Sequence, residues 1–200
     1  MRKLLIATRN KGKFPEIVAL LRGLPFEFVS LGDVSELPKD FEVEEPAMTF
    51  EGNAIIKAMT FGSKTGLLAL ADDSGLEVDA LGGRPGVLSA RYAPGSDADR
   101  CRKLLAELKE VPESQRTARF RAVIAIYDPQ NEKVRTCAGA CEGRITTEPR
   151  GSNGHGYDPV FFVSARNKTC AEMSLEEKNS ISHRGKALRT AGEILKREFT

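Results

Sequence analysis

The most constraining feature of this 200-residue sequence is a short apolar run followed closely by a helical pattern. Residues Leu4 to Thr8 are typical of a buried β-strand, and Lys11 to Arg22 carry apolar side chains at helical spacing. Pro15 fits that helix only in its first turn, where a missing N–H is tolerated. A second strand is predicted at Phe26 to Leu31. The chain therefore begins as strand, helix, strand.

The rest of the chain continues this alternation. Thr49 is a candidate N-cap for a helix that runs to about Lys64 and is ended by Gly66. The later elements are a short strand from Leu67 to Ala71 ending at Asp72, a helix from Asp99 to Lys109, strands at 118–127 and 133–140, and a final helix from His183 to Arg197. This order predicts an α/β protein with a mixed sheet, organised as a single domain over residues 1–200.

The overall charge argues against a nucleic-acid partner. Thirty basic and 28 acidic residues leave a net charge of +2, so any anionic ligand must be met by local clustering. The apolar run after Met1 is too short for a signal-peptide core or a membrane span. We therefore expect a cytoplasmic protein with neither a membrane nor a nucleic-acid partner.

The four cysteines predict neither a zinc site nor a redox motif, because none of them forms a C-x-x-C pair. Cys137 and Cys141 fall on one face of a predicted strand, too far apart along it to bond. Without a secretion signal, free structural thiols are expected.

The first strand-to-helix turn, Thr8-Arg9-Asn10-Lys11-Gly12-Lys13, combines three cations with neutral hydrogen-bonding groups. A loop that opens a helix presents backbone N–H groups and the positive end of the helix dipole. The combination suits a polyphosphate. It is not a Walker loop, because the first Gly and the Ser/Thr after Lys13 are missing. A solvated basic helix start is the alternative.

A second candidate is the acidic segment Asp72-Asp73-Ser74-Gly75 after the predicted strand. Carboxylates at the end of a strand are where open α/β sheets place ligands, and they suit Mg²⁺. If strand geometry persists, the two aspartates point to opposite sides and can have separate roles. An ordinary acidic turn is the alternative.

The helix after Thr49 carries a mixed stripe. Phe50, Asn53, Ala54 and Lys57 share one face, so Asn53 and Lys57 project beside apolar residues. A lysine on such a stripe snorkels or meets an anion. Glu44-Glu45-Pro46 lies just upstream, and surface charge is the alternative interpretation of both features.

Two polar segments near the C-terminus complete the candidates. In Gly151 to Pro159, glycines allow close approach to a ligand, His155 and Tyr157 offer ring faces for stacking, and Asp158 is an acceptor. Ser182-His183-Arg184 opens the last helix, preceded by Lys178. Both histidines fall in polar loops, which favours function over packing.

Together these segments resemble the inosine triphosphate pyrophosphatase family. The matching motifs follow the family's order over nearly the whole chain: T-x-N-x-x-K at Thr8 to Lys13, F-x-x-N-A-x-x-K at Phe50 to Lys57, A-D-D-S-G-L at Ala71 to Leu76, G-x-x-S-A-R-Y at Gly86 to Tyr92, G-x-G-Y-D-P at Gly154 to Pro159 and S-H-R at Ser182 to Arg184. The family commonly has Phe where this chain has His155, whose imidazole is smaller, polar and titratable near neutrality.

The resemblance implies an elongated, two-lobed mixed sheet flanked by helices, an active-site cleft between the lobes, and a homodimer. It implies Mg²⁺-dependent hydrolysis of abnormal purine nucleoside triphosphates (ITP, dITP and XTP) to the monophosphate and pyrophosphate. By position, Glu45 and Asp73 ligate the metal, and the catalytic residues are Asp73, Lys57 and Asp72. The residues implied to contact the nucleotide are Thr8, Arg9, Asn10, Lys11, Gly12, Lys13, Asn53, Ser74, His155, Gly156, Tyr157, Asp158, Lys178, His183 and Arg184.

The expected reaction is attack of an activated water on the α-phosphorus, with Lys13 and Lys57 stabilising the charge that develops. Donors facing the purine O6 would reject adenine, because a buried group left unpaired is costly. Three alternatives stay open: a Maf-type nucleotide pyrophosphatase, a non-catalytic nucleotide- or RNA-binding module, and an inactive family member acting as a scaffold.

Overall fold

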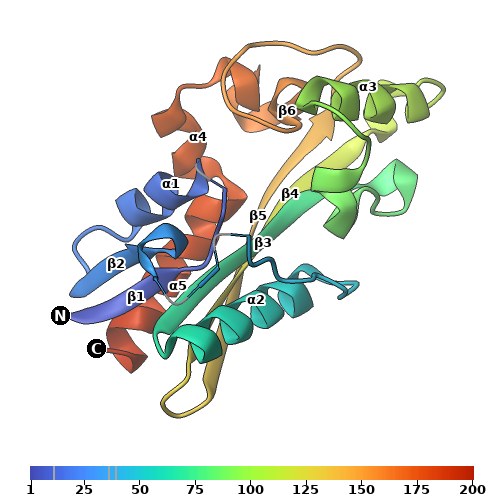
Figure 1. Ribbon diagram of the computed structural model, residues 1–200. Helices are drawn as coiled ribbons and strands as arrows, with labels where there is room; N and C mark the ends of the chain where they lie inside the picture. The colour runs from blue at the N-terminus through green and yellow to red at the C-terminus, as the bar shows by residue number, and fades with distance from the viewer. Residues whose placement is uncertain (11, 36, 39) are drawn as a thin grey trace. The chain divides into compact units, whose positions relative to one another are not determined.

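Figure 1 shows the computed structural model, which describes residues 1–10, 12–35, 37–38 and 40–200. The strands are β1 (Arg2–Ile6), β2 (Phe26–Ser30), β3 (Leu68–Val78), β4 (Thr117–Asp128), β5 (Lys133–Ile145), β6 (Phe161–Val163) and β7 (Lys168–Thr169). The α-helices are α1 (Lys13–Leu20), α2 (Phe50–Thr65), α3 (Asp97–Glu107), α4 (Leu175–Ile181) and α5 (His183–Glu198). The short 3-10 helices are η1 (Leu31–Asp33), η2 (Asp79–Leu81), η3 (Gly86–Arg91), η4 (Glu113–Gln115), η5 (Asp158–Val160), η6 (Ser164–Arg166) and η7 (Cys170–Glu172).

The strands of the described residues form one seven-stranded sheet in the order β2-β1-β3-β4-β5-β6-β7. β1 runs parallel to β2 and β3, whereas β6 runs antiparallel to β5 and β7. The sheet is therefore mixed, as the order of elements in the sequence predicts.

Internal contacts divide the chain into two compact units. Unit 1 comprises Met1–Asp73, Ala122–Ala138 and Gly185–Thr200, and unit 2 comprises Ser74–Arg121 and Gly139–Arg184. β3, β4 and β5 each pass from one unit to the other along the chain. The single domain over residues 1–200 stays a prediction.

Unit 1 has helices on both faces of its strands (Figure 1). Gly62 of α2 packs on one face, where an added Cβ would lie 2.7 Å from a ring carbon of Tyr127 and 3.3 Å from Cβ of Ala69. Side chains alternate along a strand, so the neighbours of Ala69 in β3 and of Tyr127 in β4 point the other way, towards α1 and α5. That second face is a buried cluster which includes Leu4, Ile6, Leu68, Leu70, Ile124 and Ile126 of the strands, Ile17 and Leu21 of the α1 region, and Leu188, Ala191 and Leu195 of α5.

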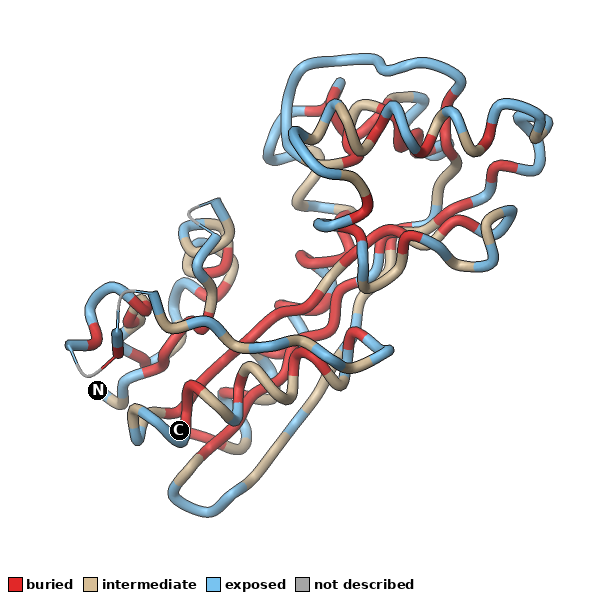
Figure 2. Tube along the Cα trace, turned by 45° about the vertical axis from the view of Figure 1, so that its right-hand side comes forward, coloured by how far each residue is buried: buried red, intermediate tan, exposed pale blue. Residues whose placement is uncertain are grey.

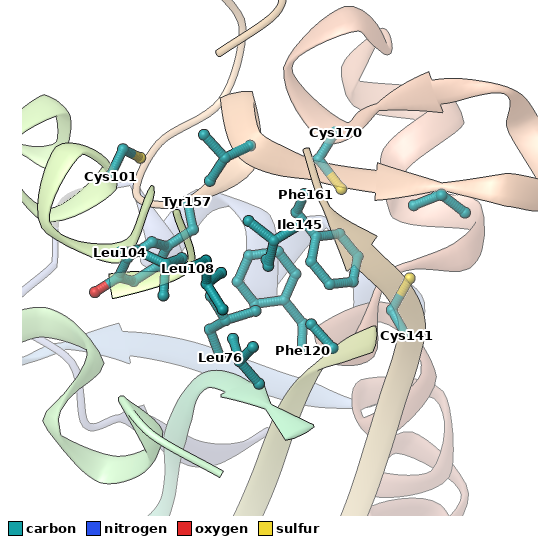
Figure 3. Close-up of a cluster of buried hydrophobic side chains, with 14 of the residues drawn as sticks. Leu76, Cys101, Leu104, Leu108, Phe120, Cys141, Ile145, Tyr157, Phe161 and Cys170 are labelled. Atoms are coloured by element: carbon teal, nitrogen blue, oxygen red, sulfur yellow. The ribbon is translucent and has the colours of Figure 1, made fainter. Parts of the chain in front are cut away.

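Unit 2 has its own apolar core, shown in Figure 3. Phe120 and Phe161 lie at its centre with ring centroids 4.4 Å apart, and Leu104 and Leu108 from the α3 region pack against them. Burying side chains of this size contributes about 1.5–3 kcal/mol each. Buried residues follow β1, β3 and β4 in Figure 2, whereas β5 is mostly of intermediate burial and residues 147–155 are exposed.

The α2 boundaries confirm the local sequence signals. Thr49 Oγ1 accepts the N–H of Gly52 at 3.1 Å, which is the predicted N-cap. Gly66 ends the helix in the left-handed conformation, with φ of 68°, and its N–H reaches the Gly62 carbonyl at 2.8 Å. Pro15 lies in the first turn of α1, as expected.

The prediction for β3 was wrong at its C-terminal end. The strand does not stop at Asp72 but continues to Val78, so both aspartates lie inside an 11-residue strand. Leu76 and Val78 are fully buried and continue the strand's alternation after the acidic pair. The sequence interpretation ended the strand too early because strands are recognised from their apolar residues, and Asp72 and Asp73 interrupt that pattern.

Two helical starts were misjudged or missed. α3 begins at Asp97, because Ser96 caps it in a reciprocal capping box with Asp99. α4 was not predicted at all. It is a 7-residue helix whose capping box joins Ser174 and Glu177.

Candidate functional site

Asp72 and Asp73 lie next to each other in β3, and strand alternation sends their carboxylates to different helices. Asp72 Oδ2 accepts the Lys13 ammonium of α1 at 2.9 Å. Asp73 Oδ1 accepts the Lys57 ammonium of α2 at 3.0 Å. The sequence prediction of two separate roles therefore has a geometric basis within unit 1.

The Asp73 side brings together four of the predicted site residues. Lys57 Nζ lies 3.0 Å from Asp73 Oδ1 and 3.3 Å from Glu45 Oε2, so one ammonium joins two carboxylates. Asn53 is fully buried and donates to Asp73 Oδ2 at 3.4 Å. The shared stripe of Asn53 and Lys57, predicted from helical spacing, is confirmed.

Burial and neighbouring charges together shift the pKa values of Asp73 and Lys57 in this cluster. Burial raises the pKa of Asp73, and the neighbouring Lys57 opposes that rise without cancelling it. Burial depresses the pKa of Lys57, but Asp73, Asp72 and Glu45 together outweigh it, so this pKa is raised. Lys57 is therefore a fixed cation, and Asp73 is a carboxylate more basic than usual.

The loop before α1 uses part of its hydrogen-bonding capacity internally. Asn10 Oδ1 accepts the backbone N–H of Gly12 at 2.9 Å and of Lys13 at 3.3 Å, and Thr8 Oγ1 accepts the N–H of Asn10 at 3.2 Å. The amides expected to be free for a phosphate are thus partly occupied. Lys11, predicted in the same loop, lies outside the described residues.

Arg9 of this loop contacts the backbone of another part of the chain. Its Nε donates to the Phe41 carbonyl at 2.9 Å, and its Nη2 donates to the carbonyls of Phe41 at 2.6 Å and of Pro38 at 3.2 Å. The guanidinium is therefore bound to the backbone of a different segment.

The other predicted residues lie in unit 2. Asp158 is buried and organises its loop, because its Oδ2 accepts the backbone N–H of His155 at 2.9 Å and the ammonium of Lys178 at 2.5 Å. Tyr157 is buried too, and its hydroxyl donates to the Ser89 carbonyl at 2.8 Å. Tyr157 is thus a packing residue of this unit, whereas His155 is exposed.

His183 was expected in a polar loop, and that prediction was wrong. It is buried at the start of α5, and its ring stacks on Phe120 with centroids 5.0 Å apart and planes 16° apart. Arg184 is buried as well and donates to Ser74 Oγ at 3.3 Å. The sequence gives no local sign of the Phe120 contact.

Asp97 is a residue that the sequence interpretation missed. Its Oδ2 accepts the N–H of Gly156 at 2.6 Å, and its other oxygen pairs with Arg100. Burial works to raise the pKa of Asp97, but the bonds from Gly156 and Arg100 and the nearby His155 outweigh it, so this pKa is lowered. The capping residue Ser96 was the available signal, since it places Asp97 in the first turn of α3.

Fold and site together define an α/β protein with a polar cluster of paired carboxylates and lysines on its sheet. Residues 4–194 match the Ham1 family. The chain is 54% identical to the dITP/XTP pyrophosphatase of Desulforamulus reducens, covering 98% of this chain and 97% of that protein. It is 53% identical to that of Geobacter sulfurreducens, with 94% of each covered. The chain therefore belongs to the Ham1 family.

Solved structures agree with this assignment. A HAM1 protein from Coxiella burnetii matches with a TM-score of 0.90 and 43% identity over 98% of both chains. A nucleoside-triphosphatase described as a dITP/XTP pyrophosphatase, from Mycobacterium abscessus, matches with a TM-score of 0.78 and 43% identity over 94% of this chain and 98% of that one. The resemblance drawn from the sequence motifs is confirmed, as is the mixed α/β fold. No helix in the described part of the chain is long and apolar enough to span a membrane.

Proposed function

We propose that this protein hydrolyses ITP, dITP and XTP to the monophosphate and pyrophosphate. The observation that carries the proposal is the cluster in which Lys57 joins Asp73 and Glu45, beside a second lysine, Lys13, on Asp72. Phosphoryl transfer asks mainly for positioning and charge, which these groups supply. Relatives named dITP/XTP pyrophosphatase support the substrate class.

Mg²⁺ is the cofactor that fits the cluster. Glu45 and Asp73 offer hard carboxylate oxygens, and their shared contact with Lys57 Nζ, at 3.3 and 3.0 Å, brings them close enough to serve one ion. The described residues contain no group of three or more His, Cys, Asp or Glu side chains that could hold a metal. Mg²⁺ does not require one, because it typically binds one or two carboxylates together with substrate phosphates. When bound, it neutralises phosphate charge and lowers the pKa of a coordinated water.

The protein groups around the phosphates have distinct proposed roles. Asp73 accepts the proton of the water that attacks the α-phosphorus, since burial makes it a stronger base than an exposed carboxylate. Lys57 and Lys13 stabilise the oxygens on which charge develops as pyrophosphate leaves. Asp72 orients Lys13 through its 2.9 Å contact, and Asn53 orients Asp73. Thr8, Asn10 and Gly12 complete the phosphate loop.

The base is the proposed ligand of unit 2. Lys178, His183 and Arg184 are donors suited to the 6-keto edge of hypoxanthine or xanthine, and an adenine amino group there would meet donors where the keto oxygen meets acceptor-seeking N–H groups. The exposed His155 offers its ring for stacking. Further contacts are proposed for Ser74, Gly156 and Asp158, whereas Tyr157 supports this loop from the core through its bond to the Ser89 carbonyl.

A panel of ITP, dITP, XTP, GTP and ATP with Mg²⁺, followed by pyrophosphate release, tests the proposal. We expect XTP and the inosine nucleotides to exceed ATP by about 10²-fold or more in kcat/KM, as for a site built to pair a substrate group. Equal rates with ATP and ITP, or orthophosphate as the first product, would contradict it. We also propose that the protein is cytoplasmic. We propose further that it is a homodimer, and light scattering of the purified chain tests that oligomeric state.

A further inference from the structure

The segment that carries Glu45 has no regular structure of its own. Between η1 and α2, the residues that the structure describes form neither helix nor strand. Such a segment loses about 1–2 kcal/mol of backbone entropy per residue when it is fixed in one conformation. The position of Glu45 beside Lys57, 3.3 Å away, therefore depends on what holds the segment on either side.

Asn53 holds the segment on the C-terminal side of Glu45. Its Oδ1 accepts the backbone N–H of Ala47 at 2.9 Å, while its amide nitrogen donates to Asp73 at 3.4 Å. Gly52 allows this approach, since a Cβ there would lie 2.7 Å from Cβ of Ala47. The buried side-chain amide of Asn53 thus connects the Glu45 segment to Asp73.

Arg9 holds the N-terminal side. Three hydrogen bonds of 2.6–3.2 Å join its guanidinium to the carbonyls of Phe41 and Pro38. The Phe41 N–H closes a turn onto the same Pro38 carbonyl at 3.0 Å. The Phe41 ring rests edge-on against Phe61 of α2, with centroids 5.7 Å apart. Phe41 is therefore fixed by its ring on α2 and by its carbonyl on the loop after β1.

We propose that Arg9 is a positioning residue, which sets the place of Glu45 by anchoring the backbone four residues before it. This inference rests on the proposed function, in which Glu45 and Asp73 hold Mg²⁺. It replaces the phosphate contact that the sequence predicts for Arg9, because two of the three guanidinium nitrogens, Nε and Nη2, are directed at backbone carbonyls. Guanidinium donors in a rigid fork suit this arrangement better than a single ammonium.

Hydrogen–deuterium exchange of the metal-free protein tests the anchor without reference to activity. In Arg9→Ala, the hydrogen-bonded amides of Phe41 and Ala47 within residues 40–47 are expected to exchange about tenfold faster or more, the equivalent of about 1.4 kcal/mol of local stability, with β1 unchanged. Arg9→Lys should recover only part of the protection. Arg22→Ala is the matched control, since Arg22 is exposed and has no hydrogen bond or ion pair with any described residue. Unchanged exchange at 40–47 in Arg9→Ala would overturn the proposal.

Steady-state kinetics then separate positioning from phosphate binding. We expect Arg9→Ala to raise the half-saturating Mg²⁺ concentration for XTP hydrolysis about tenfold, in the range found when a residue supporting a metal ligand is lost. At saturating Mg²⁺, KM for XTP and kcat should stay within about twofold of the original values. A raised KM for XTP with unchanged Mg²⁺ dependence would assign Arg9 to the phosphates and sink the inference. A wild-type protein inactive on every nucleotide would refute the proposed function, while the exchange result would still decide the anchor.

Discussion

Asp72 and Asp73 are adjacent in β3, yet Asp72 binds Lys13 of α1 at 2.9 Å and Asp73 binds Lys57 of α2 at 3.0 Å. The cause is strand alternation, since consecutive side chains leave a strand on opposite faces. An acidic turn would not impose this separation. The extension of β3 beyond the acidic pair is therefore what gives two neighbouring carboxylates different partners.

This separation predicts different phenotypes for two isosteric substitutions. Asp73→Asn should lower kcat for XTP about 10²–10⁴-fold, the usual contribution of a general base. Its stability at pH 7 should not fall by more than about 1 kcal/mol, because burial already raises the pKa of Asp73 and disfavours its charge. Stopped-time pyrophosphate assays and urea unfolding measure the two effects.

Asp72→Asn is the matched comparison. It removes the charge opposite Lys13 at a buried position, so we expect a loss of about 1–3 kcal/mol in unfolding free energy. Its kcat should fall less than that of Asp73→Asn. Equal losses of kcat in the two variants would mean that the aspartates do not have separate roles.

Asp97 is expected to affect substrate affinity more than turnover. Asp97→Ala removes the acceptor for the Gly156 N–H, so the loop before Asp158 loses its hydrogen bond to the first turn of α3 and keeps the weaker one from the Cys101 thiol to the Gly156 carbonyl. We predict an increase in KM for XTP of about tenfold with kcat little changed. Asp99→Ala is the control, because Asp99 also lies in the first turn of α3 but binds Ser96 and Arg102.

Asp99→Ala should lower stability slightly through the lost capping box and leave KM unchanged. A KM increase of the same size in both variants would show that α3 stability, and not the Gly156 contact, controls substrate binding.

How much of this protein can be predicted from sequence depends on the range of each interaction. Thr49 and Gly66 mark the ends of α2 correctly, because a cap acts within a few residues. The Asn53 and Lys57 stripe follows from helical periodicity alone. These local rules, together with the motif order, were sufficient for the fold class and the family.

Long-range contacts account for what sequence could not give. Arg9 appears basic and free in sequence, but its donors meet carbonyls of a segment more than two dozen residues away. His183 packs on Phe120 in a different element. The aromatic ring of Tyr157 led to the prediction of a stacking contact, but the side chain is buried in the core of unit 2. Each depends on tertiary packing that no window of sequence contains.

Arg116 is predicted to be essential for stability and not for catalysis. It is buried, and its guanidinium donates to the carbonyls of Val111 at 2.9 Å, Thr146 at 3.1 Å and Leu108 at 2.8 Å. Arg116→Met should lower the free energy of unfolding by about 3–5 kcal/mol, because it removes three hydrogen bonds from a charged donor at a buried position. Urea unfolding with an unchanged m-value measures the loss.

The matched control is Arg121→Met. Arg121 is exposed and pairs with Glu77 at 3.5 Å, so its removal should cost less than about 1 kcal/mol. If the two variants were equally stable, the three carbonyl contacts of Arg116 would contribute no more than a surface ion pair.

The cysteine thiols are predicted to be unreactive in the folded protein. Burial raises the pKa of Cys101 and Cys137 to about 11 and that of Cys170 to about 12. Since the thiolate is the nucleophile, at pH 8 the native protein should react with iodoacetamide far more slowly than the urea-unfolded chain, where an ordinary thiol has a pKa of about 8.5. Mass spectrometry after timed quenching counts the modified sites.

Raising the pH from 8 to 9 should leave native labelling slow, because both values lie well below these pKa values. Fast native labelling of Cys101 at pH 8 would show that the α3 packing around it opens readily, and would contradict the burial that raises its pKa.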